Sequence, residues 1–318
     1  MTGGSGFIGG ALIERLVAEG NPVRALARSE EAAARVESLG AEPVRGELGD
    51  RASLAAGAAG CATAFHLAAH LGEWGPWEDF ERGNVEGTRN ALVACEEAGV
   101  RRFVHCGTEA ALMAGEPLVH VDETAPLRPD SPAPYPATKA KAELAVREAN
   151  RDGFETVAMR PRFVWGRGDT TLLPEMVKTI EAGRFAWVGG GRNVTDTAHV
   201  DNVVEGLILC AEKGRGGESY FITDGKPVVF REFITAMLRT QAVDPPDRSL
   251  PGWTAGPLAL VSEAAWKLLP LPDEPPMTRF RAWILTQECT IEIGKASEEL
   301  GYRPIVSHEQ GLAEMRAA

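Results

Sequence analysis

Three glycines near the start of the chain, followed at once by a helical pattern, limit the fold more than any other feature. Residues 2–9 read TGGSGFIG, with glycines at positions 3, 6 and 9. Glycine is needed where a turn takes a positive φ, where backbone approaches a pyrophosphate, and where a helix packs closely on a sheet. The N-terminus of the following helix offers free N–H groups to phosphates. The pattern therefore predicts a dinucleotide-binding turn.

The residues after this turn alternate between strand-like and helix-like runs. Helical segments separate five short apolar runs, at residues 22–27, 42–45, 62–69, 102–106 and 155–164. Such alternation predicts an α/β fold with a parallel, doubly wound sheet. After Gly166 the alternation weakens, and residues 243–277 are rich in proline and large apolar side chains. We expect a nucleotide-binding domain over 1–165, joined again by 192–213, and a mainly substrate-binding lobe over 166–318.

Only Met1 and Thr2 precede the glycine turn. Such a turn normally follows a central strand of about five residues. Loss of that strand would cancel much of a typical folding stability of about 5–15 kcal/mol. We therefore expect that the start site of this sequence is placed too late and that the first strand is truncated.

Composition argues against several classes of protein. The 318 residues carry a net charge of -12, which leaves no basic surface for nucleic acid. Residues 255–271 are apolar but short, and they contain Glu263 and Lys267, so we expect no membrane span. The five cysteines form no CxxC pair, and His66 and His70 lack a third ligand at suitable spacing. We predict a cytoplasmic protein with reduced thiols and no metal.

The residues after the run at 22–27 bear on which dinucleotide binds. An acidic side chain there would bind the ribose 2′-hydroxyl of NAD and repel a 2′-phosphate. This chain instead has Arg28 and Ser29, a guanidinium and a hydroxyl that suit a phosphate. The alternative is a solvated surface arginine. The sequence favours NADP(H) and leaves NAD(H) open, with Glu47 and Leu48 placed where an adenine ring would lie.

Tyr135 and Lys139 form a YxxxK spacing at the start of a predicted helix. Residues i and i+4 share one helical face, so the ammonium would lie beside the phenol. A free phenol has a pKa of about 10 and exchanges protons poorly at neutral pH. A neighbouring cation stabilises the phenolate and lowers that pKa. The spacing therefore predicts a proton-transfer pair.

These motifs together resemble the extended short-chain dehydrogenases/reductases of the NAD-dependent epimerase/dehydratase superfamily, nearest the 3β-hydroxysteroid dehydrogenase/isomerase-like branch. The resemblance covers nearly the whole chain. Beyond TGGSGFIG it runs through HLAA at 66–69, NVEGT at 84–88, YPATK at 135–139, RPRFVWGRGD at 160–169, HVDN at 199–202, YFITDG at 220–225 and ELGYRP at 299–304. It implies a Rossmann-type doubly wound parallel sheet with a smaller C-terminal substrate lobe.

The resemblance also implies roles for individual residues. Tyr135 would exchange the proton, Lys139 would hold the nicotinamide ribose, Thr108 would hydrogen-bond the reacting oxygen, and Asn84 would support the proton relay. The implied cofactor-binding residues are Gly3, Gly6, Phe7, Ile8, Gly9, Arg28, Ser29, Glu47, Leu48, Ala68, Ala69, Lys139, Pro161 and Val164.

The implied substrate pocket contains Trp74, Phe163 and Trp165. Their rings would suit a flat, apolar molecule such as a sterol or a β-keto lipid, although the same residues would serve equally as ordinary core aromatics. Glu109 lies where dehydratases of the superfamily carry an acid, but Ala110 replaces their second acid. Glu109 is then either an auxiliary acid or a structural residue.

Thr195 stands where sugar-nucleotide epimerases place the arginine that holds a substrate diphosphate. We therefore predict an NAD(P)-dependent oxidoreductase that interconverts a secondary alcohol and a ketone on a small apolar substrate, steroid-like or lipid. A cofactor-retaining epimerase or dehydratase is the alternative enzyme, and an NADP-sensing protein without catalysis is the alternative of another class. Family members often dimerise through two helices that would begin near Asn84 and Pro136, so a homodimer is expected by analogy.

Overall fold

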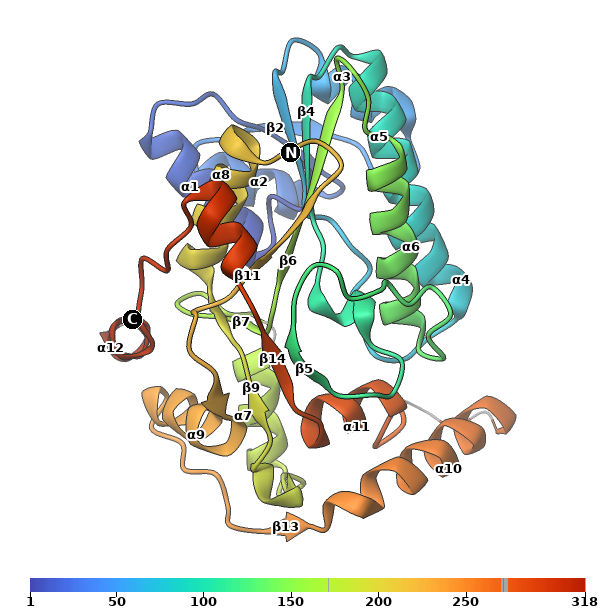
Figure 1. The fold of residues 1–318 in the computed structure, drawn as a ribbon, viewed down its shortest axis with the longest axis vertical. Helices are drawn as coiled ribbons and strands as arrows, with labels where there is room; N and C mark the ends of the chain where they lie inside the picture. The colour runs from blue at the N-terminus through green and yellow to red at the C-terminus, as the bar shows by residue number, and fades with distance from the viewer. Residues whose placement is uncertain (171, 270, 272–273, 318) are drawn as a thin grey trace.

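The structure, a computed structural model, describes residues 1–170, 172–269, 271 and 274–317. Residues 171, 270, 272, 273 and 318 fall in the predicted C-terminal lobe and lie outside the described residues. Figure 1 shows a twisted sheet between two layers of helices in the upper half, and short strands with further helices below it. The predicted α/β class with a Rossmann-type parallel sheet is confirmed.

The sheet of the upper half is entirely parallel. β1 pairs with β2, and a second set runs in the order β3, β4, β6, β11. Its short strands are bounded by glycine turns and polar residues, as expected for buried parallel strands. The strands are β1 (Arg24–Ala27), β2 (Glu42–Arg45), β3 (Thr63–His66), β4 (Arg102–Cys106), β6 (Glu155–Pro161) and β11 (Ser219–Ile222).

Met1 and Thr2 lie between β1 and β3 and join the two parts of the sheet. The N–H of Leu26 donates to the Met1 carbonyl at 2.9 Å, and the N–H of Thr2 donates to the Phe65 carbonyl at 3.0 Å. Thr2 also pairs with His66 in the parallel sense. The residues directly before the glycine turn therefore take the central place in the strand order.

Helices cover both faces of this sheet. α3 and α6 pack on opposite sides of α5 over one face, while α1 and α8 pack together over the other, where α8 lies against β4 and β6. Side-chain caps begin two of them: Ser29 accepts from the N–H of Ala32, and Asp50 accepts from the N–H of Ala52. The bounds are α1 (Phe7–Ala18), α2 (Glu30–Ser38), α3 (Arg51–Ala58), α5 (Gly87–Glu97), α6 (Pro134–Glu148) and α8 (Val200–Lys213).

The main core lies between this sheet and the layer of α1 and α8. Leu12 of α1 and Leu207 of α8 are fully buried against Val104 and Val157 of the sheet. Because β4, β6 and β11 are covered on both faces, most of their buried side chains are apolar, and burial rather than strand propensity holds them.

The lower half is built from short strands and helices. A mixed sheet runs in the order β12, β9, β14, β5, and two parallel pairs join β7 to β10 and β8 to β13. Its strands are β5 (Leu118–Val121), β7 (Val164–Trp165), β8 (Trp187–Val188), β9 (Val194–Thr195), β10 (Ala198–His199), β12 (Val228–Val229), β13 (Ser249–Leu250) and β14 (Cys289–Ile291). Its helices are α7 (Leu172–Glu181), α9 (Phe230–Thr240), α10 (Ala255–Leu268), α11 (Arg279–Thr286) and α12 (His308–Ala317).

A short helix, α4 (Trp77–Phe80), continues into a π-helical turn over Glu81–Glu86 before α5 begins. π-helical turns are rare and occur frequently at functional sites. In the described part of the chain, no helix combines the length and the apolar character needed to cross a membrane.

Candidate active site

The glycine turn is packed so tightly that side chains are excluded from it. A Cβ on Gly9 would lie 2.1 Å from the Gly3 carbonyl oxygen, and a Cβ on Gly3, whose φ is +75°, would lie 2.7 Å from the Ala68 nitrogen. The following helix, α1, has no side-chain cap and no acidic residue in its first turn. Backbone N–H groups and the positive end of the helix dipole are thus left for an anion. This arrangement fits a dinucleotide pyrophosphate.

The other predicted cofactor residues lie after the carboxyl ends of strands. Arg28 and Ser29 follow β1, Glu47 and Leu48 follow β2, and Ala68 begins the segment after β3. Ala69 continues that segment, Pro161 ends β6, and Val164 begins β7. In a parallel sheet these ends share one edge, where doubly wound folds bind their ligands. Arg28 is exposed and has no ion-pair partner among the described residues.

α6 places Tyr135 and Lys139 on one face, as its spacing predicts. The Lys139 ammonium is buried and donates to the Cys106 carbonyl at the end of β4, with a distance of 2.9 Å. Burial lowers the pKa of Lys139. Tyr135 is half-buried and its ring centroid lies 5.7 Å from that of Phe280. The phenol interacts with the Thr108 hydroxyl, so the predicted tyrosine, lysine and threonine lie together.

Thr108 and Glu109 form a buried polar pair beside this phenol. The Thr108 hydroxyl accepts from the N–H of Ala110 at 3.2 Å and donates to Glu109 Oε2 at 2.8 Å. The pKa of Tyr135 is raised, first by burial and next by the charge of Glu109, while the interaction with Thr108 acts in the opposite direction. These effects keep the Tyr135 phenol protonated at neutral pH.

Arg162 neutralises Glu109 inside the protein. Its Nη1 lies 2.5 Å from Glu109 Oε1, and both side chains are almost fully buried. Its Nε and Nη2 donate to the Thr195 hydroxyl at 3.1 and 3.0 Å. The hydroxyl of Thr195, the residue at the position of the epimerase arginine, therefore accepts its hydrogen bonds from Arg162. Arg162 was not among the residues predicted for the site, although a second arginine that alternates with Arg160 in an otherwise apolar run indicates a buried ion pair.

Asn84 lies in the π-helical turn and joins α6 to the loop after β3. Its amide nitrogen donates to the His70 carbonyl at 3.2 Å and to the Thr138 hydroxyl at 3.1 Å. Its amide oxygen accepts from the N–H of His70 at 2.7 Å. Asn84 thereby holds the loop that follows β3 in place against α6, the helix that carries Tyr135. Its position is that of a supporting residue.

Tyr135 also lines an open cavity of about 700 Å³ in the lower half. Phe163 contributes to the same wall with a left-handed backbone, φ 44°, which is rare for an aromatic residue and costs about 1–3 kcal/mol. Most other described lining residues are apolar, among them Val164, Met176, Trp187, Phe230 and Leu285. The phenol is thus the proton-bearing group of a large, mainly apolar pocket.

Comparison with known proteins agrees with this geometry. Residues 1–252 match the 3-beta hydroxysteroid dehydrogenase/isomerase family. The chain belongs to this family. It is 46% identical, over 100% of its own length and 95% of the relative's, to 4-hydroxy-2-methyl-3-oxo-4-farnesyl-3,4-dihydroquinoline-1-oxide ketoreductase of Stigmatella aurantiaca. It is 36% identical to 2-alkyl-3-oxoalkanoate reductase of Stenotrophomonas maltophilia, over 100% of this chain and 98% of that protein.

Solved structures extend the comparison to the wider superfamily. A dTDP-glucose 4,6-dehydratase, DesIV of Streptomyces venezuelae, was solved with NAD and has a TM-score of 0.76. It is 25% identical and matches 99% of this chain and 94% of its own. A nicotinamide dinucleotide as cofactor therefore accords with both the family and the fold.

Two aromatic residues expected at the pocket of this 3-beta hydroxysteroid dehydrogenase/isomerase family member do not line it. Trp165 is fully buried, and its indole N–H donates to Asp224 at 2.8 Å. Its ring packs edge-on against His199, with centroids 4.8 Å apart. Trp74 lies under the Lys267 ammonium, 5.8 Å from the ring centroid. Trp165 is thus a core residue, and of the predicted aromatic set only Phe163 lines the described cavity.

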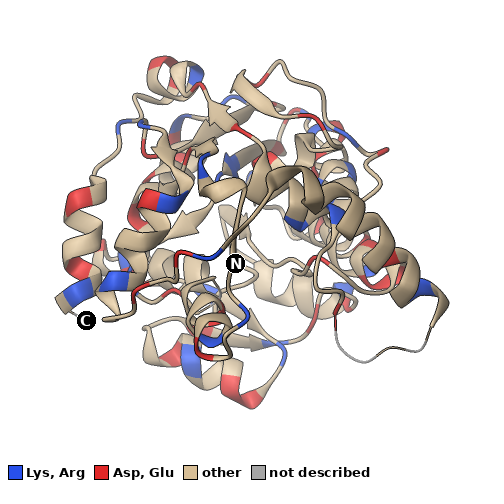
Figure 2. Ribbon diagram, turned by 90° about the horizontal axis from the view of Figure 1, so that it is seen from below, with Lys and Arg blue, Asp and Glu red and all other residues tan. Residues whose placement is uncertain are grey.

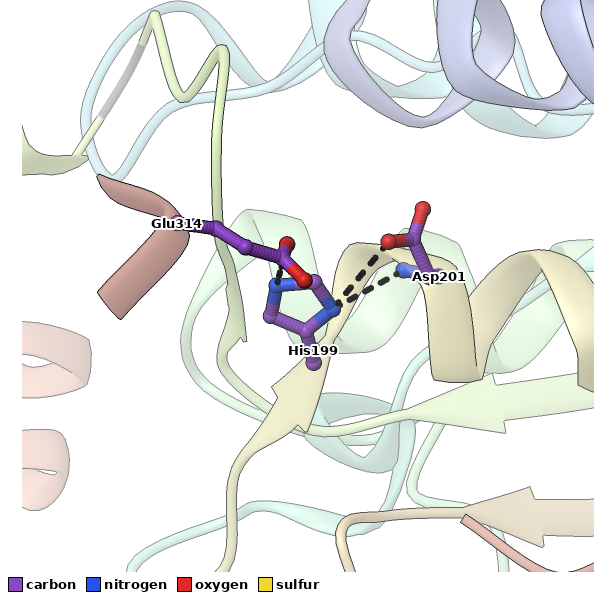
Figure 3. A group of neighbouring side chains, drawn as sticks. All are labelled: His199, Asp201 and Glu314. Atoms are coloured by element: carbon purple, nitrogen blue, oxygen red, sulfur yellow. Dashed lines mark hydrogen bonds and ion pairs between the residues drawn. The ribbon is translucent and has the colours of Figure 1, made fainter. Parts of the chain in front are cut away.

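His199, Asp201 and Glu314 are the described residues that come nearest to a metal-ligand set (Figure 3). Asp201 Oδ2 lies 3.7 Å from Nδ1 of the imidazole, whereas Glu314 Oε2 lies 4.0 Å from Nε2. One ion cannot bind both nitrogens of a single ring, and Nδ1 already accepts from the N–H of Asp201 at 3.3 Å. His199 therefore acts here as the cap of α8.

Proposed function

We propose that this protein is an NADP(H)-dependent ketoreductase that reduces a ketone on a bulky, apolar molecule to a secondary alcohol. The observation that carries the proposal is the position of Tyr135, which interacts with Thr108 and also lines the apolar cavity. The more general activity, interconversion of an alcohol and a ketone on an apolar substrate, is shared by the reductases and dehydrogenases to which the chain is similar.

Reduction consumes the proton that Tyr135 holds at neutral pH. Burial and the charge of Glu109 both raise the pKa of this phenol. A general acid must be protonated before the step, whereas alcohol oxidation needs the phenolate as base. At neutral pH the site is prepared for proton donation.

The chain's own groups would position the reactants and supply the proton. A nicotinamide cofactor, held by the glycine turn and by the residues that follow β1 and β2, would supply the hydride. Tyr135 donates its proton to the carbonyl oxygen, while Lys139 holds the ribose and offsets the developing phenolate charge. Thr108 orients the phenol. Residues 1–165 and 192–213 would hold the cofactor, and 166–318 mainly the substrate.

The polar residues of the cavity favour a neutral substrate. Arg281 in its lining is already paired with Glu73, with an Nε–Oε2 distance of 2.7 Å. A substrate carboxylate would have to break this pair or use the exposed Arg184. The ketone is therefore of the neutral, prenylated-ring type named for the Stigmatella relative, rather than the 3-oxoalkanoate named for the Stenotrophomonas relative.

Turnover of two ketones tests the reaction and its substrate. A neutral, alkylated cyclic ketone and a 2-alkyl-3-oxoalkanoate are each incubated with NADPH, and alcohol and NADP are both quantified. We expect a higher kcat/KM for the neutral ketone, with one NADPH consumed for each alcohol formed. A product formed without net cofactor consumption would instead establish the epimerase or dehydratase reaction, and cofactor binding without turnover of either ketone would favour the sensor.

Arg28 is the proposed contact to the 2′-phosphate of NADPH. Removal of a guanidinium–phosphate contact in Arg28→Ala should weaken NADPH binding about tenfold or more and leave NADH binding nearly unchanged. Arg24→Ala is the matched control, since Arg24 lies at the opposite end of β1 and is also partly exposed. Fluorescence titration of both cofactors gives the comparison. Equal affinity for NADH and NADPH in the unaltered protein would refute the preference.

A further inference from the structure

The exposed apolar side chains of this protein are concentrated in one segment. Twelve large apolar residues are exposed among the described residues, and eight of them lie between residues 250 and 271. The most exposed are Leu268 at 83%, Trp253 at 80% and Val261 at 68%. Single exposed leucines are normal, but a contiguous group of this kind marks an interaction surface.

Helix α10 carries the centre of this group on one face. Its buried side, which includes Ala255, Ala259 and Glu263, packs against the protein near α11. At 100° per residue, the opposite face is formed by positions that are all exposed and all apolar: Pro257, Leu260, Val261, Ala264 and Leu268. Solvated helices normally carry polar residues on this side, so the outward face of α10 has the opposite of the usual pattern.

Between residues 248 and 271 the exposed charged side chains are basic, although the protein is strongly acidic and the exposed acids Asp247 and Glu274 flank this stretch. The sole acid between residues 248 and 271 is Glu263, which is turned inward and pairs with Arg279 at 2.8 Å. Arg248 and Lys267 are the exposed charges of the same segment. The whole chain has a net charge of -12. Figure 2 looks at the molecule from this end and shows the helix that leads into the grey trace as mostly tan, which marks uncharged residues.

The apolar surface is continuous with the proposed substrate cavity. Leu250 of β13 and Leu258 of α10 are exposed at 37% and 40%, and both also line the cavity that contains Tyr135. The edge of the cavity and the outward face of α10 therefore belong to one apolar region. An apolar molecule held on the outer surface would reach the cavity without crossing charged groups of this segment.

We propose that α10 and the flanking Trp253 dock on the surface of a lipid bilayer, so that the cavity opens toward the membrane. An apolar helix face, a tryptophan beside it and basic residues at its flanks are the features of interfacial helices that lie in the headgroup region of anionic membranes. The further step, that the ketone enters from the bilayer, rests on the proposed function, whereas the docking itself does not.

The same features disfavour a second copy of the chain as the occupant. A two-fold interface brings the same patch of both subunits together. Both exposed charges between residues 248 and 271, Arg248 and Lys267, are positive in each copy, so this stretch offers no opposite charges that could pair across such an interface. Figure 1 shows α10 as a single helix along the lower edge of the molecule, away from α5 and α6.

Flotation of the full chain with vesicles tests the docking. Vesicles of phosphatidylcholine are compared with vesicles that also contain phosphatidylglycerol. The test variant changes three outward residues, Leu260→Ser, Val261→Ser and Leu268→Ser. The matched control removes three exposed apolar side chains elsewhere, Leu71→Ser, Val119→Ser and Ile305→Ser. Thermal unfolding by circular dichroism checks that both variants fold.

We expect the unaltered protein and the control to float, more strongly with phosphatidylglycerol, and the outward variant to lose binding about tenfold or more. No flotation of the unaltered protein, or equal flotation of the outward variant, would overturn the proposal. Sedimentation velocity tests the alternative occupant, a second copy of the chain. A dimer in the unaltered protein that is absent in the outward variant would assign this face to a second copy. Vesicle binding without any ketone turnover would leave the docking in place and reject the proposed function alone.

Discussion

Thr108 has one hydroxyl hydrogen, and in this structure Glu109 accepts it. A hydroxyl that donates to a carboxylate presents its lone pairs to its other neighbours, here the N–H of Ala110. While the bond to Glu109 is made, Thr108 has no hydrogen to donate to a substrate oxygen. Glu109 is a positioning residue for Thr108 and an electrostatic influence on Tyr135.

Glu109→Gln should shift the pH dependence of ketone reduction toward lower pH. Removal of the negative charge lowers the pKa of Tyr135, so the phenol loses its proton earlier and the basic limb of the kcat profile moves down by about one unit. Glu263→Gln is the control, because it also removes a buried carboxylate paired with an arginine but lies on α10. An unchanged basic limb in a folded Glu109→Gln protein would refute this influence.

Tyr135→Phe should abolish most of the reduction without loss of cofactor binding. Positioned proton donors contribute about 10²–10⁴-fold, so kcat should fall by that factor while the Kd for NADPH stays within error. Tyr220→Phe provides the comparison: Tyr220 is fully buried and its hydroxyl donates to Glu299, away from the cavity lining. Equal loss in both variants would mean that the effect is one of folding.

At the scale of elements, local patterns predicted the backbone well. β2 and β4 have the ends that the apolar runs at 42–45 and 102–106 indicate. These signals are local, since each depends on neighbours within a few residues.

Pairings between distant segments could not be predicted in the same way. Glu109 meets Arg162 across 53 positions, and Trp165 meets Asp224 across 59. Periodicity carries no information on such partners, so Trp165 was expected at the pocket on resemblance alone. Tyr135 and Lys139 could be placed together because residues i and i+4 share one helical face, and Thr108 was placed beside them on the resemblance alone.

The close packing of the glycine turn predicts how a substitution at the start of α1 will affect cofactor binding. Gly9→Ala should disrupt the turn, because its Cβ would lie 2.1 Å from the Gly3 carbonyl oxygen. Gly10→Ala is the neighbouring control, since its Cβ would make only an ordinary contact at 3.5 Å with Leu39 and would raise helix stability by about 0.5–1 kcal/mol. Cofactor titration should show binding lost in the first variant and kept in the second. Binding retained by Gly9→Ala would contradict the close packing.

At the scale of the whole molecule, one carboxylate ties several distant segments together. Asp224, after β11, accepts hydrogen bonds from Trp165 and from the backbone of His199, each within 2.8 Å, and pairs with His308 at 3.1 Å. Burial opposes its ionisation, but the bonds from His308, His199 and Thr197 outweigh that effect and lower the pKa of Asp224. Its charge therefore stabilises the fold at neutral pH.

Asp196 lies in the same region and should have the opposite effect on stability. It is almost fully buried, its Oδ2 accepts from the N–H of Ile291 at 2.8 Å, and its Oδ1 has no partner among the described residues. Burial raises the pKa of Asp196 to about 6. A raised pKa in the folded state means that stability is highest below the unfolded value of about 4 and falls as pH rises to about 6.

Asp196→Asn should therefore stabilise the protein at pH 7 and have little effect at pH 4. The amide keeps an oxygen for Ile291 and carries no charge to desolvate, which corresponds to a gain of about 1–3 kcal/mol at pH 7. Asp224→Asn should do the reverse and lower stability at pH 7, because it removes a charge that the fold satisfies. Chemical denaturation of both variants at the two pH values measures the four differences. A destabilised Asp196→Asn at pH 7 would show that its attraction to Arg162 outweighs the burial of its charge.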